Sequence, residues 1–281
     1  MPKQLIINSS DFNRSNNKFI YQFPVRQQFK KGDQVGLSSI NIYNSFYNVS
    51  SVYGNNVFTF TFPSTVPIVV SITIPNGYYS ISDLNYFLQQ QCIANDLYCT
   101  STTNSNYIYF TEFVTNSVRY AGQINLYTLP TSSQASALGY AIPSNATWTF
   151  PAVATTPTIT FETSFGLLLG FTSGTYPPLI TTSNIQYVSN VCPTLSVVNS
   201  LIMTCNLINN HGISIPSSIF NSIALTNGFG SMITVNGAQI IYSDIATNDY
   251  NSIEIQFYDQ NLNLLTILDP DVLITLSLIQ N

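Results

Sequence analysis

The chain has 281 residues, of which 45% are hydrophobic and 13% aromatic, so it can bury a large core and is not a disordered protein. Only 7% of its residues are charged, against roughly 25% in an average soluble protein, so amides and hydroxyls must cover most of the surface. Such a surface gives little repulsion between copies, which favours self-association. Codon bias in an AT-rich genome is an alternative explanation of the composition, and the two are compatible.

The formal charge of −5 is unevenly distributed along the chain. Residues 1–31 carry +5, from six bases and the acid Asp11, whereas residues 32–281 carry −10, from Arg119 and eleven acids. Residues 1–17 are therefore predicted to form a basic arm for nucleic acid, an anionic membrane face or an acidic patch on a neighbouring subunit. The competing interpretation is a solvated N-terminus without a partner. The candidate contact residues are Lys3, Arg14, Lys18, Arg26, Lys30 and Lys31.

The lack of a recognisable secretion signal and the spacing of the cysteines both point to a reducing compartment. The opening MPKQLIINSSDFN has no positive segment followed by an apolar run, so we expect a soluble product made in the cytosol. The cysteines lack the C-x-x-C spacing of zinc sites, and buried free thiols are favoured over disulfides. These cysteines are Cys92, Cys99, Cys192 and Cys205.

Short β-branched or alternating runs recur along the chain, separated by turns rich in Gly, Pro and Asn. In residues 57–62 (VFTFTF) the three phenylalanines share one face, as in a half-buried strand. Residues 252–258 likewise direct Ile253, Ile255 and Phe257 inward. This pattern predicts an all-β sandwich or barrel over residues 18–281. The expected strands are 5–8, 18–23, 34–43, 57–62, 66–74, 107–114, 123–129, 158–162, 195–205, 239–244, 252–258 and 271–279.

Residues 80–94 break the strand pattern and predict one amphipathic helix laid over the sandwich, with Ser80 as its N-cap and Asp83 three residues later. Its apolar residues recur near helical spacing at Ile81, Leu84, Leu88 and Cys92. A second short helix is expected over residues 164–169, ended by Gly170. Residues 115–157, rich in Ser, Ala, Pro and Thr, are interpreted either as an insertion between strands or as long loops.

The residues that enzymes need are scarce. His211 is the single histidine, it lies in a turn-like context, and no G-x-S-x-G motif accompanies it. Metal-dependent β-sandwich enzymes assemble several histidines, and phosphate-binding glycine motifs are missing. Asp259, Asp269 and Asp271 are interpreted as turn residues in preference to calcium ligands. We therefore predict no catalytic residue, no metal, no cofactor and no small-molecule substrate.

Several segments together resemble the penton (vertex) and minor capsid proteins of virophages, polinton-like viruses and related small icosahedral double-stranded DNA viruses. One departure is Asn263-Leu264-Leu265, where such tails often carry a proline. The resemblance covers nearly the whole chain and is weakest between residues 115 and 157. The segments that carry it are 31–33 (KGD), 35–40 (VGLSSI), 43–46 (YNSF), 74–81 (IPNGYYSI), 83–88 (DLNYFL), 165–171 (FGLLLGF), 174–177 (GTYP), 257–261 (FYDQN) and 268–270 (LDP).

This resemblance implies a single jelly-roll β-sandwich that stands at the fivefold vertices of a virion as a homopentamer. It also implies contacts with the surrounding trimeric double jelly-roll major capsid proteins, synthesis in the host cytoplasm or a viral factory, and no catalytic residues. Two alternatives stay open. One is a β-sandwich attachment module whose exposed tyrosines stack on glycans. The other is a minor or cement capsid protein away from the vertex.

Overall fold

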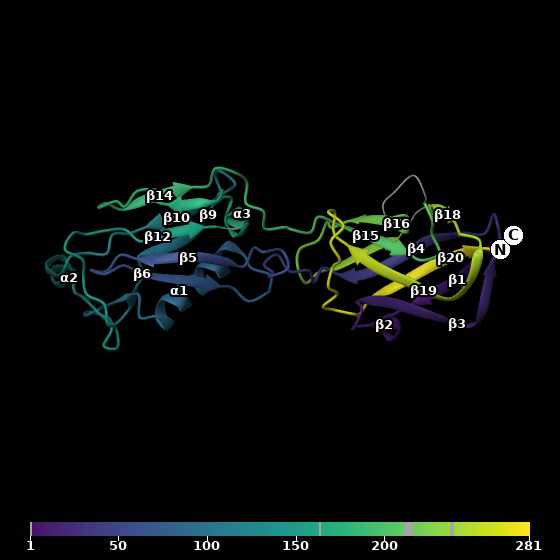
Figure 1. Ribbon diagram of the computed structural model, residues 1–281, viewed down its shortest axis with the longest axis horizontal. Helices are drawn as coiled ribbons and strands as arrows, with labels where there is room; N and C mark the ends of the chain where they lie inside the picture. The colour runs from purple at the N-terminus through teal and green to yellow at the C-terminus, as the bar shows by residue number, and fades with distance from the viewer. Residues whose placement is uncertain (1, 163, 211–215, 237–238) are drawn as a thin grey trace. The chain divides into compact units, whose positions relative to one another are not determined.

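The computed structural model describes residues 2–162, 164–210, 216–236 and 239–281, and the chain divides into two compact units (Figure 1). Unit 1 comprises Met1–Phe46 and Val198–Asn281, and unit 2 comprises Tyr47–Val197. Unit 2 is thus inserted in the sequence of unit 1. This differs from the expected single domain over residues 18–281 with an insertion at 115–157, because the inserted segment is longer and has its own core.

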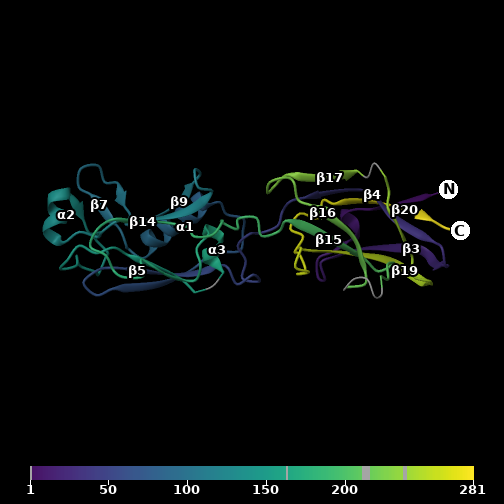
Figure 2. The same cartoon turned by 90° about the horizontal axis from the view of Figure 1, so that it is seen from above.

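Unit 1 contains two antiparallel sheets of five strands each. The first has the order β1-β20-β4-β17, with β18 also paired to β4, and the second has the order β16-β15-β19-β3-β2. Figure 2 shows β4, β17 and β20 in one layer and β3, β15 and β19 in the other. The elements are β1 (Lys3–Ile7), η1 (Ser9–Asp11), β2 (Phe12–Asn13), β3 (Lys18–Phe29), β4 (Gln34–Tyr43), β15 (Ser200–Cys205), β16 (Ile219–Ala224), β17 (Met232–Asn236), β18 (Tyr242–Asp244), β19 (Asn248–Tyr258) and β20 (Leu273–Ile279).

The strand order of unit 1 is that of a jelly roll. If β17 and β18 are counted as one interrupted strand and β2, a two-residue edge strand paired antiparallel with β3, is left out, the first sheet reads 1-8-3-6 in chain order and the second 5-4-7-2. Consecutive strands therefore alternate between the two sheets except for the hairpin of β15 and β16, which gives the paired Greek keys of this fold. The all-β jelly roll predicted for the chain is confirmed for unit 1, and unit 2 joins it between the third and fourth strands.

The core of unit 1 lies between its two sheets and follows the period-2 pattern of the strands. Ile253, Ile255 and Phe257 of β19 are buried, as the sequence predicts, and they face Ile274 and Leu276 of β20 across the sandwich. Such fully buried side chains each contribute about 1.5–3 kcal/mol relative to exposure. The alternation of these strands therefore fixes which face of each sheet is inside.

The N-terminal residues belong to the jelly roll. β1 pairs along its length with β20, and Ile7 is fully buried. Phe12 packs on Phe19, with 4.9 Å between ring centroids. The structure therefore differs from the separate arm expected over residues 1–17, because apolar side chains in this segment complete the core of unit 1.

Unit 2 combines three small antiparallel sheets with three helices, and its sheets have the orders β13-β12-β5-β6, β14-β10-β9 and β11-β7-β8. Phe58, Phe60 and Phe62 of β5 are buried as predicted, and Phe58 stacks on Phe165 at 4.7 Å. The elements are β5 (Val57–Phe62), β6 (Ile68–Thr73), α1 (Ile81–Ala94), β7 (Cys99–Ser101), β8 (Tyr107–Ile108), β9 (Thr111–Asn116), β10 (Ala121–Leu126), α2 (Ser132–Leu138), β11 (Tyr140–Ala141), β12 (Thr158–Phe161), α3 (Phe165–Leu169), β13 (Gly174–Tyr176) and β14 (Ile185–Val188).

The two predicted helices are confirmed, and a third was not predicted. α1 begins at a capping box formed by Ser80 and Asp83, and α3 ends at Gly170, whose φ is 81°. The third helix, α2, begins at an equivalent capping box of Thr131 and Gln134. It lies in the segment 115–157, which also contains β10 and β11 and is therefore structured.

A buried asparagine ties the two ends of unit 2 together. The Nδ2 group of Asn48 donates to the carbonyls of Tyr79 (2.8 Å) and Leu195 (3.0 Å), and its Oδ1 accepts from the N–H of Tyr79 (2.8 Å). Asn48 is almost completely buried. Because a buried amide needs its full set of partners, this side chain fixes the start of unit 2 against its last residues.

Candidate functional site

The six basic residues of the N-terminal segment have different partners. Lys18 pairs with Glu254 at 2.9 Å, and Arg26 pairs with Asp249 at 3.0 Å. Within the described part of the chain, the other four cations form no ion pair: Lys3, Arg14, Lys30 and Lys31. These four charges are available to a partner, whereas the charges of Lys18 and Arg26 are largely neutralised.

Three of the unpaired cations lie at one end of unit 1, which we call the lysine end (Lys3, Lys30 and Lys31). Lys3 faces Leu278 in the ladder of β1 and β20, and β4 begins opposite Ile279, three residues after Lys31. Both chain termini lie at this end of unit 1 (Figure 2). All three lysines are exposed.

The backbone of the lysine end is held by a buried carboxylate. Asp33 accepts from the N–H of Lys30 (2.8 Å) and from the N–H of Asn281 (2.9 Å), and its side chain is almost fully buried. The carboxylate of Asp33 is therefore stabilised by backbone N–H groups and does not form an ion pair with the lysines. The Nζ group of Lys3 donates to Oε1 of Gln280 (2.8 Å), a neutral partner, so the charges of the three exposed lysines are not neutralised by an ion pair among the described residues.

The structure does not bring all six basic residues into one patch. Arg14 lies in the turn between β2 and β3, and Lys18 begins β3, whereas Lys30 and Lys31 follow its other end. β3 is 12 residues long, which is about 40 Å at the usual rise of a strand. The predicted basic surface is therefore divided between two ends of unit 1.

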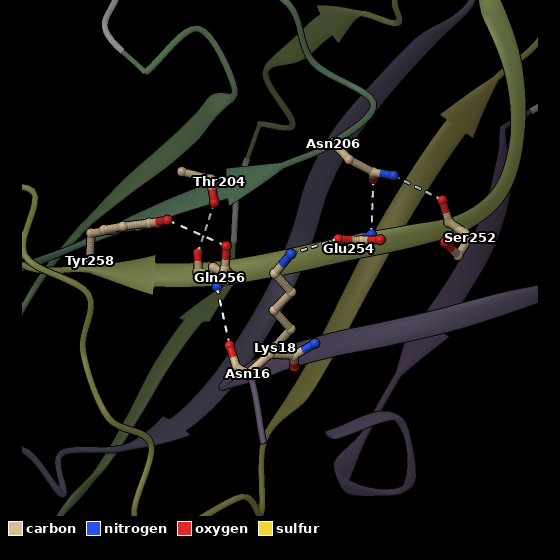
Figure 3. Close-up of polar contacts among 8 residues, drawn as sticks. All are labelled: Asn16, Lys18, Thr204, Asn206, Ser252, Glu254, Gln256 and Tyr258. Atoms are coloured by element: carbon tan, nitrogen blue, oxygen red, sulfur yellow. Dashed lines mark hydrogen bonds and ion pairs between the residues drawn. The ribbon is translucent and has the colours of Figure 1, made fainter. Parts of the chain in front are cut away.

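The outer face of the second sheet of unit 1 carries a continuous set of polar contacts (Figure 3). Asn206 accepts from the N–H of Glu254 (2.9 Å) and donates to the carbonyl of Ser252 (3.0 Å). Gln256 donates to the carbonyl of Asn16 (3.4 Å) and accepts from the hydroxyl of Tyr258 (3.3 Å).

This face is polar but electrically balanced. Its one cation drawn in Figure 3, Lys18, faces its one carboxylate, Glu254, and the remaining side chains are amides and hydroxyls. They alternate with the buried residues of β19, which directs them outward. The alternation that predicts the core residues of β19 from the sequence also identifies its outward set: Ser252, Glu254, Gln256 and Tyr258.

The outer face of the first sheet is also poor in charge. Ile6 of β1 lies beside Thr275 of β20, and Asn41 of β4 lies beside Leu273, with their inward neighbours buried. Ile6 is 54% exposed, so an apolar side chain lies open on this face. The Oδ1 atom of Asn41 is buried without a hydrogen-bond partner. Among the described residues, one unpaired carboxylate lies on this face: Asp244 of β18 is exposed and accepts only from the neutral amide of Gln34.

Three of the four cysteines are buried. Burial raises the pKa of the thiols of Cys92, Cys99 and Cys205 to about 12, so they stay protonated and weakly nucleophilic near neutral pH. All four cysteines are free thiols, as predicted, although Cys192 is exposed. His211 lies outside the described residues.

The C-terminal aspartates form turns, which confirms their interpretation from the sequence. Asp259 is buried, and its Oδ1 accepts from the N–H groups of Asn261 and Asn263, both at 2.8 Å. Asp269 accepts from the N–H of Asp271 at 3.0 Å. Across the described ranges, no group of three or more His, Cys, Asp or Glu side chains is placed to hold a metal ion. In the same ranges, no helix has the length and hydropathy needed to cross a membrane.

Comparisons with known proteins return matches among solved structures only. No protein-family model and no curated protein matches the sequence. The chain is similar to the mavirus penton protein, with 10% identity, a TM-score of 0.46 and coverage of 100% of this chain and 99% of that one. It is also similar to a chain in the cryo-EM structure of the Sputnik virophage, with 10% identity, a TM-score of 0.41 and coverage of 100% and 97%.

Proposed function

We propose that this protein is a non-enzymatic structural subunit of an icosahedral viral capsid, and that five copies form the vertex. The observation that carries the proposal is the strand order of unit 1, a jelly roll with one charge-balanced outer face and, among the described residues, a single unpaired carboxylate, Asp244, on the other. The resemblance read from the sequence independently names the same role. The protein is accordingly assigned to the virion, after synthesis in the host cytoplasm or a viral factory.

The balanced faces suit a cyclic assembly. A ring of identical subunits uses heterologous contacts, in which one flank of each copy meets the other flank of the next. Interfaces of this kind are depleted in charge at their centre and enriched in aromatic residues. The pair of Lys18 and Glu254 and the amides around it supply a flank without net charge.

The lysine end supplies a second contact, to the rest of the particle. Its three exposed lysines suit an acidic patch on a neighbouring trimeric double jelly-roll major capsid protein, which the vertex would tie in place. The genome or an inner membrane is the other anionic partner available inside a particle. Three cations give only weak, salt-sensitive affinity for phosphate, so a capsid neighbour with additional contacts is the better partner.

Native mass spectrometry and electron microscopy of the full chain, alone and co-expressed with the major capsid protein, test the vertex assignment. We expect a pentamer, and fivefold density at the vertices of assembled shells. A trimer would support the cement alternative instead of the vertex. A stable monomer that never enters particles would contradict both capsid roles.

A triple variant tests the lysine end. Replacing Lys3, Lys30 and Lys31 by Ser leaves the backbone bonds to Asp33 intact, so the variant should fold and form pentamers but enter particles poorly. The matched control is Arg14→Ser, which removes an exposed cation from the other end of β3. Equal incorporation of the two variants, measured by quantitative blotting of purified particles, would contradict the role of the lysine end.

A replacement of His211 tests the absence of catalysis. His211→Ala is expected to leave particle assembly unchanged, and the purified protein is expected to show no hydrolytic or redox turnover that depends on this residue. An activity that the substitution abolishes would contradict the proposal that the chain has no catalytic role.

A further inference from the structure

A pocket of about 540 Å³ lies within unit 2, where β8, β11 and α2 approach the segments around β10 and β14. This volume lies in the range of small-molecule sites, roughly 300–1,000 Å³. Three tyrosines that are separated in the sequence line the pocket: Tyr109, Tyr127 and Tyr140. Gln134, Thr182 and Asn184 contribute the principal polar groups.

The lining of this pocket is uncharged. It contains no Asp, Glu, Lys, Arg or His side chain among the described residues that form it. Burial is the largest cause that raises the pKa of Tyr127, and the negative charge of Glu112 is the second. The phenol of Tyr127 is therefore also neutral near physiological pH. An ionic ligand would find no countercharge here, so the pocket selects against ions.

Two amide side chains in the pocket are fixed in a defined orientation. The Oε1 atom of Gln134 accepts from the N–H of Thr131 (2.9 Å), and the Oδ1 atom of Asn184 accepts from the N–H of Thr128 (2.8 Å). Because a backbone N–H only donates, the oxygen of each amide must face it. The NH₂ groups of Gln134 and Asn184 have no partner among the described residues and remain available as donors.

A half-buried carboxylate positions one of the aromatic rings. The Tyr127 hydroxyl donates to Oε2 of Glu112 (3.3 Å), which also accepts from Nδ2 of Asn125 (3.1 Å). The ring of Tyr127 is therefore held from behind the pocket. A preoriented ring and preoriented amides reduce the entropy that a ligand must lose on binding.

We propose that this pocket is a binding site for a neutral saccharide. The C–H face of a sugar ring is apolar and packs on tyrosine rings, which also offer a hydroxyl. Its hydroxyl oxygens accept from the free NH₂ groups of Gln134 and Asn184, and its hydroxyl protons are donated to neighbouring oxygens. Both amides are exposed and lie where the pocket meets solvent, so they can bond the outer hydroxyls of a sugar while its ring packs on the tyrosines, and an anion would meet no cation. The site is independent of the vertex assignment, because all of its residues belong to unit 2.

Glycan-array screening of the full chain, followed by calorimetric titration with the neutral oligosaccharide that binds best, tests this proposal. Gln134→Glu and Asn184→Asp keep the oxygen that accepts from the backbone but replace the NH₂ donor, so the local fold is preserved. Each substitution is expected to weaken binding at least tenfold. The matched control is Gln90→Glu, which adds the same charge on an exposed position of α1 and should leave the affinity unchanged.

Three outcomes would overturn the proposal. They are the absence of saturable binding to any neutral glycan on the array, binding restricted to sialylated or sulfated glycans, and equal affinity of the wild-type protein and both pocket variants. Backbone amide chemical shifts of α2 in the Gln134→Glu variant verify that the helix persists, so a loss of binding is attributable to the lost donor. Pentamer formation is measured on the same samples and separates this test from that of the vertex assignment.

Discussion

The two units of this chain differ in how they use charge and secondary structure. Unit 1 contains 14 of the 19 charged residues, six bases and eight acids, while unit 2 contains Arg119 and four acids. Unit 1 consists of two sheets with a single core, whereas unit 2 combines small sheets with three helices around a second core. Charge is therefore concentrated in the unit that we assign to shell contacts, and a neutral pocket lies in the other.

This difference indicates a division of work along the chain. In unit 1 four charges form two ion pairs across strands and three lysines lie at the lysine end, so the outer face of the second sheet stays balanced. In unit 2 the near absence of charge leaves hydrogen-bonding amides and hydroxyls as the means of polar recognition. The predictions below test whether the two units are as independent as this comparison suggests.

Deletion of β1 should have the largest effect. Removing residues 2–8 exposes the edge of β20 and empties the site of Ile7, so the free energy of unfolding of unit 1 should fall by about 4 kcal/mol or more. Differential scanning calorimetry should show the transition of unit 1 lost or strongly lowered, and Lys3→Ser is the control. A deletion variant as stable as the wild type would show that β1 is a dispensable arm after all.

A matched pair of phenylalanine replacements tests the independence of the two cores. Phe257→Ala in unit 1 and Phe60→Ala in unit 2 each remove a buried ring and should each cost about 3–5 kcal/mol. In calorimetry each variant is expected to lower only the transition of its own unit. If either replacement lowers both transitions equally, the two units unfold as one.

Replacement of the buried asparagine should destabilise unit 2 selectively. Asn48→Ala leaves the backbone groups of Tyr79 and the carbonyl of Leu195 without their partner, at a cost of about 2–4 kcal/mol. Hydrogen exchange should show faster exchange near both ends of unit 2. Asn145→Ala, at an exposed position, is the control, and similar exchange in both variants would contradict the role of Asn48.

The capping box of α1 should give a smaller, pH-dependent effect. Ser80→Ala should cost about 1 kcal/mol, and Gln90→Ala, at an exposed position of α1, is the control. Two hydrogen bonds lower the pKa of Asp83 below its ordinary value of 3.8. The larger effect comes from the hydroxyl of Ser80 and the smaller from the backbone N–H of Ser80. The stabilisation by Asp83 is therefore present above the ordinary value of 3.8 and lost as the pH falls through the lowered pKa. An NMR titration should show the pKa of Asp83 rising towards 3.8 in the Ser80→Ala variant, and an unchanged pKa would contradict this account.

The smallest effect on stability is expected for the exposed ion pair. Lys18→Gln should cost less than about 1 kcal/mol, but it leaves Glu254 unpaired on a face that we assign to subunit contact. Native mass spectrometry should therefore show fewer pentamers for Lys18→Gln, with recovery in the double variant Lys18→Gln/Glu254→Gln. If the double variant assembles no better than the single one, the neutrality of this face does not control pentamer formation.

Many helices and strands were predictable because their formation depends on residues that are close in the sequence. The alternation in residues 57–62 predicts the bounds of β5, and the cap at Ser80 predicts the start of α1. α2 has the same capping signal at Thr131 and Gln134, but only Ala135 of its residues is buried. The helix therefore lacks the apolar periodicity that would have identified it.

Features that depend on distant contacts were not predictable from such patterns. The boundaries of unit 2 fall between Phe46 and Tyr47 and between Val197 and Val198, where no change in composition marks them. From the sequence, β1 is likewise expected in a separate arm, because the positive charge of the N-terminal segment stands out more than its apolar spacing. The pocket of unit 2 brings together Tyr109, Tyr127 and Tyr140, which only the tertiary structure shows to be neighbours.

The insertion of unit 2 at a single connection of the jelly roll also has an evolutionary consequence. Asn48, near its start, is bonded to Leu195, near its end, so the two ends of the inserted segment lie close together. A segment with neighbouring ends can be exchanged or diversified while the strand ladders of unit 1 keep their register. The same junction offers a place for grafting foreign domains onto a particle.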